Sequence, residues 1–412
     1  MLKNYFKIAI AVLRRRKFFT FISLFGISFT LTILMVLTAF MDNIISPAYP
    51  DMKRDRSLYI KRLELRNEKE GWVNTSSSSF YFLTHYAGRI KRAEKMAIAS
   101  DGTSANAYVN NKKIVIQLKY TNADFWEVAD YDFPEGKPFN KQQIAQSERV
   151  AVICQSTKID YFGDEPNVVG KYIEADNIKY RVIGVVKDVS ITSDPYYANM
   201  FVPYTLSKSD YKSTGHRGDY SAVVLAKSTD DVEKIQKEYA QITSKIPTGD
   251  KGMDKLYSYA DTYFRSIVRN MYGGGSNSGF SKFLLMIGGA IFLFMLLPTI
   301  NLVNINITRI MERSSEIGVR KAFGASSKTL VYQFIIENII LTILGGLLGV
   351  IFSIGALHLI NESGVVVGLH LTLNFTILFY GLLTCLLFGL ISGVYPAWRM
   401  SKLNVVKALK AQ

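Results

Sequence analysis

Two stretches of this sequence approach the glycine and lysine spacing with which proteins hold nucleotide phosphates. Gly274–Ser281 (GGSNSGFS) has two glycines at the spacing of a phosphate-binding loop, but Phe280 stands where a lysine would reach the phosphates. Gly324–Thr329 (GASSKT) has the Lys-Thr pair, but Val319 and Arg320 stand where the first glycine would be needed. Neither stretch is therefore predicted to bind a nucleotide, and we expect no cofactor on this chain.

Other groups of reactive side chains also lack the spacing of a catalytic or metal site. The sequence has no H-E-x-x-H, no G-x-S-x-G and no C-x-x-C motif. The histidines and cysteines are scattered over the chain: His85, His216, His358, His370, Cys154 and Cys385. We therefore predict neither an enzyme nor a metal site, and no disulfide framework.

One carboxylate, Glu337, stands inside a long apolar run. Ionisable groups in such runs are costly and are functional candidates by default. Glu337 would lie about two turns, roughly 10 Å, from the start of its helix. Two interpretations stay open: a carboxylate at headgroup depth paired with a nearby Arg or Lys, and a proton or ion role.

A short mixed-charge segment, EIGVRKAFG, lies between two long apolar runs. Ser314 or Ser315 can cap a helix start, and Gly324 suits a left-handed stop. These signals predict a two-turn helix over Glu316–Phe323. A helix this short is not stable alone, so we expect it to dock against another protein. The candidate site residues are Glu316, Ile317, Gly318, Val319, Arg320, Lys321, Ala322, Phe323 and Gly324.

Four apolar runs exceed the roughly 20 residues that cross a bilayer core. We predict membrane-spanning helices at residues 18–41, 283–307, about 330–359 and about 375–398. The first run is longer than the apolar region of a cleaved signal peptide, which favours an uncleaved anchor. Small residues four apart, Gly345/Gly349 and Gly389/Gly393, permit close packing within the bundle or at a dimer seam.

The distribution of charge orients these helices. Residues 1–17, 308–329 and 399–412 together carry fifteen Lys and Arg against two acidic residues, whereas 42–281 is nearly balanced. The positive-inside rule places both termini and the 308–329 loop in the cytoplasm. Residues 1–17 are predicted to form an interfacial helix on the inner leaflet. The net charge of +15 is thus a topology signal, and we expect no nucleic-acid partner.

The long segment 42–281 is predicted to be an extracytoplasmic α+β domain. Strand-like alternation occurs at 57–65, 112–120, 149–154, 172–174, 180–186 and 220–226. Amphipathic helices are expected at 80–91, 123–129 and 230–246. Thr75–Ser79 is interpreted as a loop or helix cap, and Gly273–Gly279 as a flexible break. The fold class is therefore an α-helical membrane protein of four spans, with this domain between the first two.

Several motifs resemble one family of transporter subunits. "MERSSEIGVRKAFGASSKTLVYQFIIENIILTILGGLLG" and the tail "GVYPAWRMSKLNVVKALKAQ" resemble the coupling region of FtsX-like, MacB-type ABC transporter permeases. "NADFWEVADYDFPEGKPF", "RVAVICQSTKIDYFGDEPNVVGKYI", "YRVIGVVKDV" and "MFVPY" resemble the MacB-type periplasmic core domain. The resemblance covers nearly the whole chain and involves separate motifs in the expected order.

This resemblance implies a multi-pass permease of the bacterial inner membrane that works as a homodimer or heterodimer. ATP would be bound by a separate ABC ATPase subunit, since only 17 residues precede the first span, and Glu316–Phe323 would dock in that subunit. ATP-driven closure would then move the extracytoplasmic domain, which is called mechanotransmission, in an efflux or export cycle. A distal insert at about 121–220 and a periplasmic adaptor are also implied.

The alternatives differ in what the outside domain contacts. One is a non-transporting regulator that relays ATPase action to cell-wall hydrolases. A sensor of antimicrobial peptides is disfavoured because such relatives have more spans. The Gly273–Gly279 stretch departs from the expectation of a continuous lever into the second span. Either the lever is broken at this stretch, or the coupling of ATPase movement to the outside domain runs mainly through the first helix.

Overall fold

The computed structural model describes most of the chain. The described residues are 17–109, 112–209, 211–312, 327–363, 371–376 and 378–384, with residues 10, 11, 15, 319, 386, 387 and 390. The chain divides into two compact units. The helical unit contains residues 1–43, 284–365 and 370–412, and the sheet domain contains 44–283 and 366–369. The predicted interfacial helix at 1–17 falls almost entirely outside the described residues.

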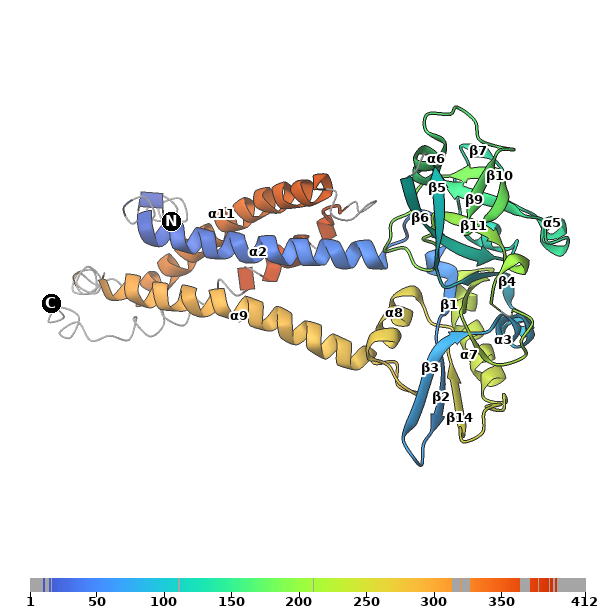
Figure 1. The fold of residues 1–412 in the computed structure, drawn as a ribbon. Helices are drawn as coiled ribbons and strands as arrows, with labels where there is room; N and C mark the ends of the chain where they lie inside the picture. Colours follow the sequence, from blue (N-terminus) through green and yellow to red (C-terminus); the bar gives the residue numbers. More distant parts are fainter. Residues whose placement is uncertain are drawn as a thin grey trace. The chain divides into compact units, whose positions relative to one another are not determined.

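Long helices lie where three of the spans are predicted (Figure 1). They are α2 (Lys17–Ile45), α9 (Phe280–Glu312) and α11 (Ser327–Glu362). Among the described residues, Lys17–Ile45 and Ile335–Glu362 are long and apolar enough to cross a membrane, and Phe280–Leu293 is a shorter apolar helix. The fourth predicted span is described only in pieces, so the count of four stays a prediction.

Helices α2 and α11 pack closely through glycines. A Cβ atom at Gly345 would lie 2.8 Å from Cβ of Ile27, and one at Gly349 would lie 2.9 Å from Cβ of Leu31. The Thr32 hydroxyl donates to the carbonyl oxygen of Gly349 at 3.3 Å. The Gly345/Gly349 pair therefore serves packing within one chain, because small residues let helix backbones approach. Gly389 and Gly393 lie outside the described residues.

We expect Gly349→Ala to destabilise the helical unit by about 1–3 kcal/mol, since the new methyl group would overlap the side chain of Leu31. Gly355→Ala, on the same helix, is the matched control because a Cβ there meets nothing within 4 Å. Thermal unfolding of the detergent-solubilised protein should separate the two variants. Equal melting temperatures would contradict the close packing of α2 on α11.

Glu337 is buried on α11, with only 1% of its surface exposed. Asn338 and Thr342, also on α11, are buried as well. The carboxylate therefore lies against protein rather than lipid, which is compatible with both interpretations of this residue.

The sheet domain is built on one continuous sheet. Within the described ranges, fourteen strands pair in the order β14-β2-β3-β13-β4-β6-β11-β8-β10-β7, with β1 on β13, β12 on β3, β5 on β6 and β9 on β10. The strands are β1 (Ser57–Ile60), β2 (Leu63–Asn67), β3 (Trp72–Ser78), β4 (Ala93–Ser100), β5 (Thr103–Val109), β6 (Lys112–Thr121), β7 (Glu135–Gly136), β8 (Val150–Cys154), β9 (Tyr172–Ala175), β10 (Ile178–Val186), β11 (Met200–Pro203), β12 (Arg217–Gly218), β13 (Tyr220–Ala226) and β14 (Lys255–Ser258).

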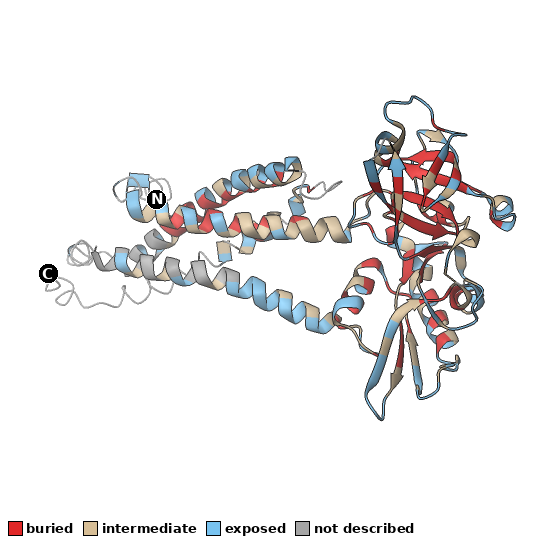
Figure 2. Ribbon diagram, viewed as in Figure 1, coloured by how far each residue is buried: buried red, intermediate tan, exposed pale blue. Residues whose placement is uncertain are grey.

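Both faces of this sheet carry a hydrophobic core, because successive side chains of a strand point to opposite faces. On β1, Leu58 and Ile60 belong to one core and Tyr59 to the other. On β13, Val224 belongs to the first core and Val223 to the second. Figure 2 shows the burial concentrated in these strands. Because the central strands are covered on both faces, their sequences are continuous apolar runs.

Short helices cover the two faces. They are α3 (Phe80–His85), α4 (Phe125–Val128), α5 (Lys141–Ala145), α6 (Gln155–Phe162), α7 (Val232–Thr243) and α8 (Tyr263–Tyr272), with a 3₁₀ turn η3 at Tyr204–Leu206. Leu83 of α3 and Ile235 of α7 enter the first core, whereas Phe125 of α4 and Tyr263 of α8 enter the second.

Each predicted strand and helix of this domain has a counterpart, but two local predictions are wrong in part. Ser79 does cap α3, accepting from the Phe82 N–H, yet the serine-rich residues before it form strand β3. Pairing with β2 overrides their weak strand propensity. Gly273–Gly279 breaks the helix as predicted, but it is a packed turn closed by backbone hydrogen bonds between Gly274 and Asn277.

Candidate functional site

The predicted coupling helix lies outside the described residues, with one exception. Helix α9 ends at Glu312 and α11 begins at Ser327, so Glu316–Gly324 lies in the connection between them. Of this connection only Val319 is described, and its side chain is 45% exposed. Docking of Glu316–Phe323 on an ATPase therefore stays a prediction.

The described residues do show how the sheet domain holds the ends of α2 and α9. The first of these joints is centred on Arg54, which is 7% exposed. Its Nη1 atom donates to the carbonyl oxygen of Ile44 at 2.9 Å and also to that of Ser46. The last carbonyls of a helix have no partner within the helix, and a cation there is favoured by the helix dipole. Arg54 thus binds the C-terminal end of α2 through hydrogen bonds.

A buried carboxylate holds Arg54 in this position. The Arg54 Nε donates to Oδ2 of Asp51 at 2.8 Å, and the same oxygen accepts from the hydroxyl of Tyr59 at 2.6 Å. Burial and the Asp51 charge hold the pKa of Tyr59 well above its usual value, so the phenol stays a donor. The guanidinium also lies 3.9 Å from the ring centre of Tyr263, the first residue of α8.

The second joint holds the turn that precedes α9. Glu64 on β2 is 2% exposed and pairs with Arg66 and, at 2.8 Å, with Arg62. Its Oε1 atom also accepts from the backbone N–H of Gly275 at 2.9 Å. Burial alone would raise the pKa of Glu64, but these hydrogen bonds outweigh it and lower the pKa. The charged Glu64 carboxylate thus connects the glycine turn to the sheet by a hydrogen bond.

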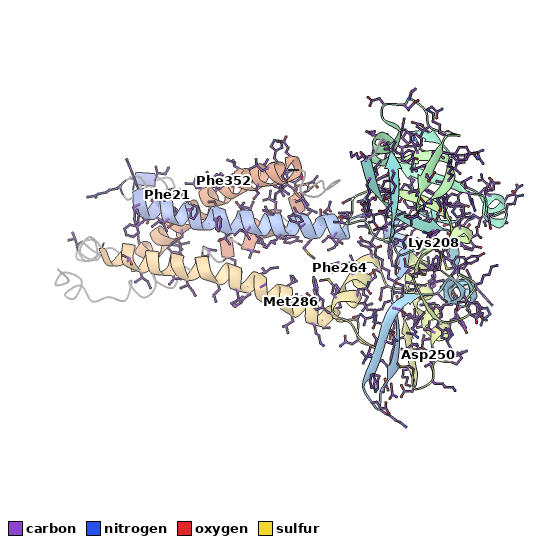
Figure 3. The ribbon with its side chains drawn as sticks, viewed as in Figure 1. Phe21, Lys208, Asp250, Phe264, Met286 and Phe352 are labelled. Atoms are coloured by element: carbon purple, nitrogen blue, oxygen red, sulfur yellow. The ribbon has the colours of Figure 1, made fainter. Side chains whose placement is uncertain are left out.

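Close packing fixes the start of α9 on α8. Gly279 has φ +72°, and a Cβ there would lie 2.5 Å from the carbonyl carbon of Tyr272. The ring of Phe264 meets that of Phe283 at 5.4 Å between centroids, and Tyr272 meets Phe283 at 5.9 Å. Figure 3 marks Phe264 on α8. The glycine turn therefore folds back closely on the end of α8.

Helix α8 connects the two joints. Its first residue, Tyr263, packs on Arg54 and edge-on against Tyr59, 5.1 Å between ring centroids. Near its end, Arg269 donates to both oxygens of Asp261, at 2.5 and 3.2 Å. The backbone of Asp261 in turn pairs with that of Tyr59 on β1. This ten-residue helix thus contacts Arg54, which binds the end of α2, and also contacts the start of α9 and the sheet.

Sequence reasoning did not find these joints. Arg54, Glu64 and Arg269 are ordinary charged residues in the sequence, and their partners lie up to 211 positions away. A signal was present at Gly273–Gly279, since a cluster of glycines beside a membrane span indicates tight turns or close contacts. The sequence pattern alone predicts a flexible break there, whereas the structure shows a packed turn.

The described residues thus form long apolar helices and an α+β domain with a core on each face of its sheet, an arrangement typical of a membrane protein with a large domain outside the bilayer. The comparison with known families agrees: residues 20–242 match the MacB-like periplasmic core domain, and residues 288–405 match the FtsX-like permease C-terminal domain. The chain belongs to this family and is an ABC transporter permease of the MacB/FtsX type.

Individual relatives are distant but cover most of the chain. It is 26% identical over 319 residues to an uncharacterized ABC transporter permease, YknZ, of Bacillus subtilis, covering 77% of this chain and 75% of the relative. It is 26% identical to a macrolide export ATP-binding/permease protein, MacB, of Campylobacter jejuni, over 76% of this chain and 47% of the relative. It is 23% identical to a pyoverdine export ATP-binding/permease protein, PvdT, of Pseudomonas fluorescens, over 77% of this chain and 46% of the relative. The chain thus spans about half the length of the last two.

Proposed function

We propose that this permease converts ATP hydrolysis by a separate ABC ATPase subunit into movement of its sheet domain, in an export cycle. The observation that carries this proposal is that α8 packs on Arg54, which binds the end of α2, and on Phe283 at the start of α9. A displacement of α2 or α9 would be passed to β1 and β2 through buried charged contacts. Loose linkers at these positions would absorb the same displacement.

The partners follow from the same proposal. The ATPase is proposed to be a second protein that docks on Glu316–Phe323, because membership of an ABC permease family implies a partner ATPase. The permease is proposed to act as a dimer in the bacterial inner membrane, with both termini and the 308–329 loop in the cytoplasm. Export is favoured over regulation of hydrolases because the printed names of MacB and PvdT describe export.

The coupling segment gives the direct test. We expect Gly318→Pro or Ala322→Asp to leave membrane insertion intact and to abolish association with the ATPase, because each disrupts the predicted docking helix or its apolar side. Ala325→Asp is the matched control, since it makes the same change just beyond the predicted stop at Gly324. Association is measured by co-purification with the ATPase. Full association of both variants would show that the segment is not the docking element.

A further inference from the structure

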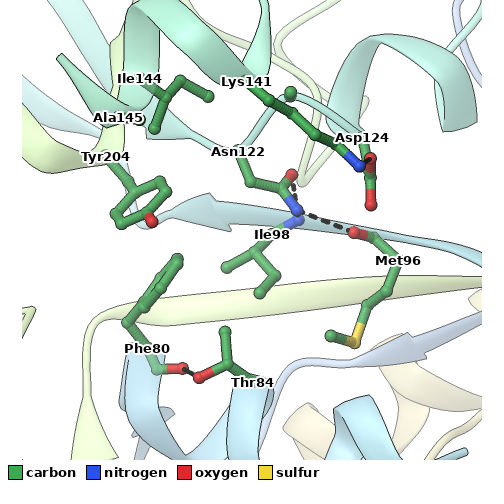
Figure 4. A pocket seen from close by; sticks show the side chains of 11 residues that line it. Phe80, Thr84, Met96, Ile98, Asn122, Asp124, Lys141, Ile144, Ala145 and Tyr204 are labelled. Carbon is green, nitrogen blue, oxygen red and sulfur yellow. Dashed lines mark hydrogen bonds and ion pairs between the residues drawn. The ribbon is translucent and has the colours of Figure 1, made fainter. Parts of the chain in front are cut away.

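The sheet domain contains a cavity of about 370 Å³ between its two halves (Figure 4). Helix α3 and strand β4 form one wall, and α5 and η3 form the other. The two halves are joined here by the pairing of Ala99 on β4 with Thr121 on β6 and by hydrogen bonds of Asn122 to Ile98 and Met96. Ligand sites favour such junctions, and this volume falls within the usual range of roughly 300–1,000 Å³.

The walls of this cavity are largely apolar and include two aromatic side chains. Phe80 and Tyr204 stack with their ring centroids 4.0 Å apart, one from each half of the domain. Met96, Ile98 and Ile144 complete the apolar lining. A wall of this kind suits the hydrocarbon or aromatic body of a ligand, and aromatic faces also attract a cation.

The fixed charge on the cavity is a carboxylate. Asp124 is 24% exposed, and its Oδ1 atom is shielded from solvent and has an ion-pair contact with Lys141 but no well-aligned hydrogen bond. The nearest cation is Nζ of Lys141, at 3.2 Å, on a side chain that is 74% exposed. The neighbouring Lys95 forms an ion pair with Glu127, in which Nζ and Oε2 are 2.9 Å apart. A single ion pair stabilises an exposed lysine only weakly, so the Lys141 side chain can readily move away from Asp124.

From this combination we propose that the cavity binds an amphiphilic organic cation, with its apolar body on Phe80 and Tyr204 and its positive group on Asp124. The cation takes the place of the Lys141 ammonium, which moves into solvent. As a statement about the exported substrate this rests on the proposed function, while the binding itself does not. An anionic amphiphile would leave the Asp124–Lys141 pair in place and would meet no other cation among the residues that line the cavity.

The test compares two probes of nearly equal shape, methyltriphenylphosphonium, which is cationic, and triphenylphosphine oxide, which is neutral. Binding to the full chain in nanodiscs is measured by equilibrium dialysis, with empty nanodiscs subtracted. We expect saturable binding of the cation that is about tenfold tighter than that of the oxide. Asp124→Asn should remove this preference, and Lys141→Met should strengthen cation binding because the competing ammonium is gone.

Two further variants test whether the probes bind in this cavity. Asp130→Asn, which removes an ion-paired carboxylate that does not line the cavity, should leave both affinities unchanged. Ala145→Trp fills the cavity from an exposed position and should abolish binding of both probes. Equal affinity for the two probes, or a charge preference that survives Asp124→Asn, would overturn the proposal. Because no ATPase is present in this binding assay, full association of Ala322→Asp with the ATPase would count against the proposed function alone.

Discussion

Arg54→Met is expected to lower the free energy of unfolding by about 3–5 kcal/mol and to uncouple the sheet domain from α2. The substitution leaves the Asp51 carboxylate, which is 2% exposed, as a buried charge without its cation. It also leaves the carbonyl oxygens of Ile44 and Ser46 without their donor. Chemical denaturation of the full chain in detergent measures the first effect, and ATPase stimulation in nanodiscs measures the second.

The control for this variant is an exposed ion pair of the same domain. Arg92→Met breaks the pair with Glu238, in which the arginine is 53% exposed, and should cost at most about 1 kcal/mol. Arg54→Lys should fall in between, because an ammonium keeps the charge but lacks the planar fork that reaches Asp51 and the carbonyls together. An Arg54→Met protein as stable as Arg92→Met would rule out this joint as a structural anchor.

Gly279→Ala is the second prediction with a large expected effect. The new methyl group would lie 2.5 Å from the Tyr272 carbonyl carbon and 2.8 Å from the Gly273 nitrogen, and backbone atoms cannot move aside as side chains do. We expect the start of α9 to shift away from α8. ATPase stimulation should then fall strongly while co-purification with the ATPase is retained, because the predicted docking segment is unaltered.

Gly252→Ala separates this clash from ordinary backbone strain. Gly252 also has a positive φ, +86°, but a Cβ there meets nothing within 4 Å, so the cost is only the left-handed conformation, about 1–2 kcal/mol. The clash at Gly279 should add about 1–3 kcal/mol to that cost. If both variants stimulated the ATPase normally, the turn would not transmit movement between α9 and the sheet domain.

The sequence by itself was sufficient for the apolar helices and for the outline of the sheet domain. Runs such as 18–41 and 330–359 are recognisable because hydropathy is summed over local residues, and α2 and α11 lie there. Strands at 149–154 and 220–226 were recognisable for the same reason, since each contains a local run of apolar residues. Orientation and the docking role of 316–323 remain predictions from charge and from resemblance.

Only the tertiary structure decided what the glycine turn and the charged residues around it do. The Gly273–Gly279 sequence is equally compatible with a loose linker and a tight turn, because glycine imposes no conformation of its own. Glu64 and Arg62 select the tight turn from more than 200 positions away, through Gly275 and the carbonyl oxygen of Arg269. Contacts at such separation leave no periodic trace in a sequence, since each depends on where the whole sheet brings its strands.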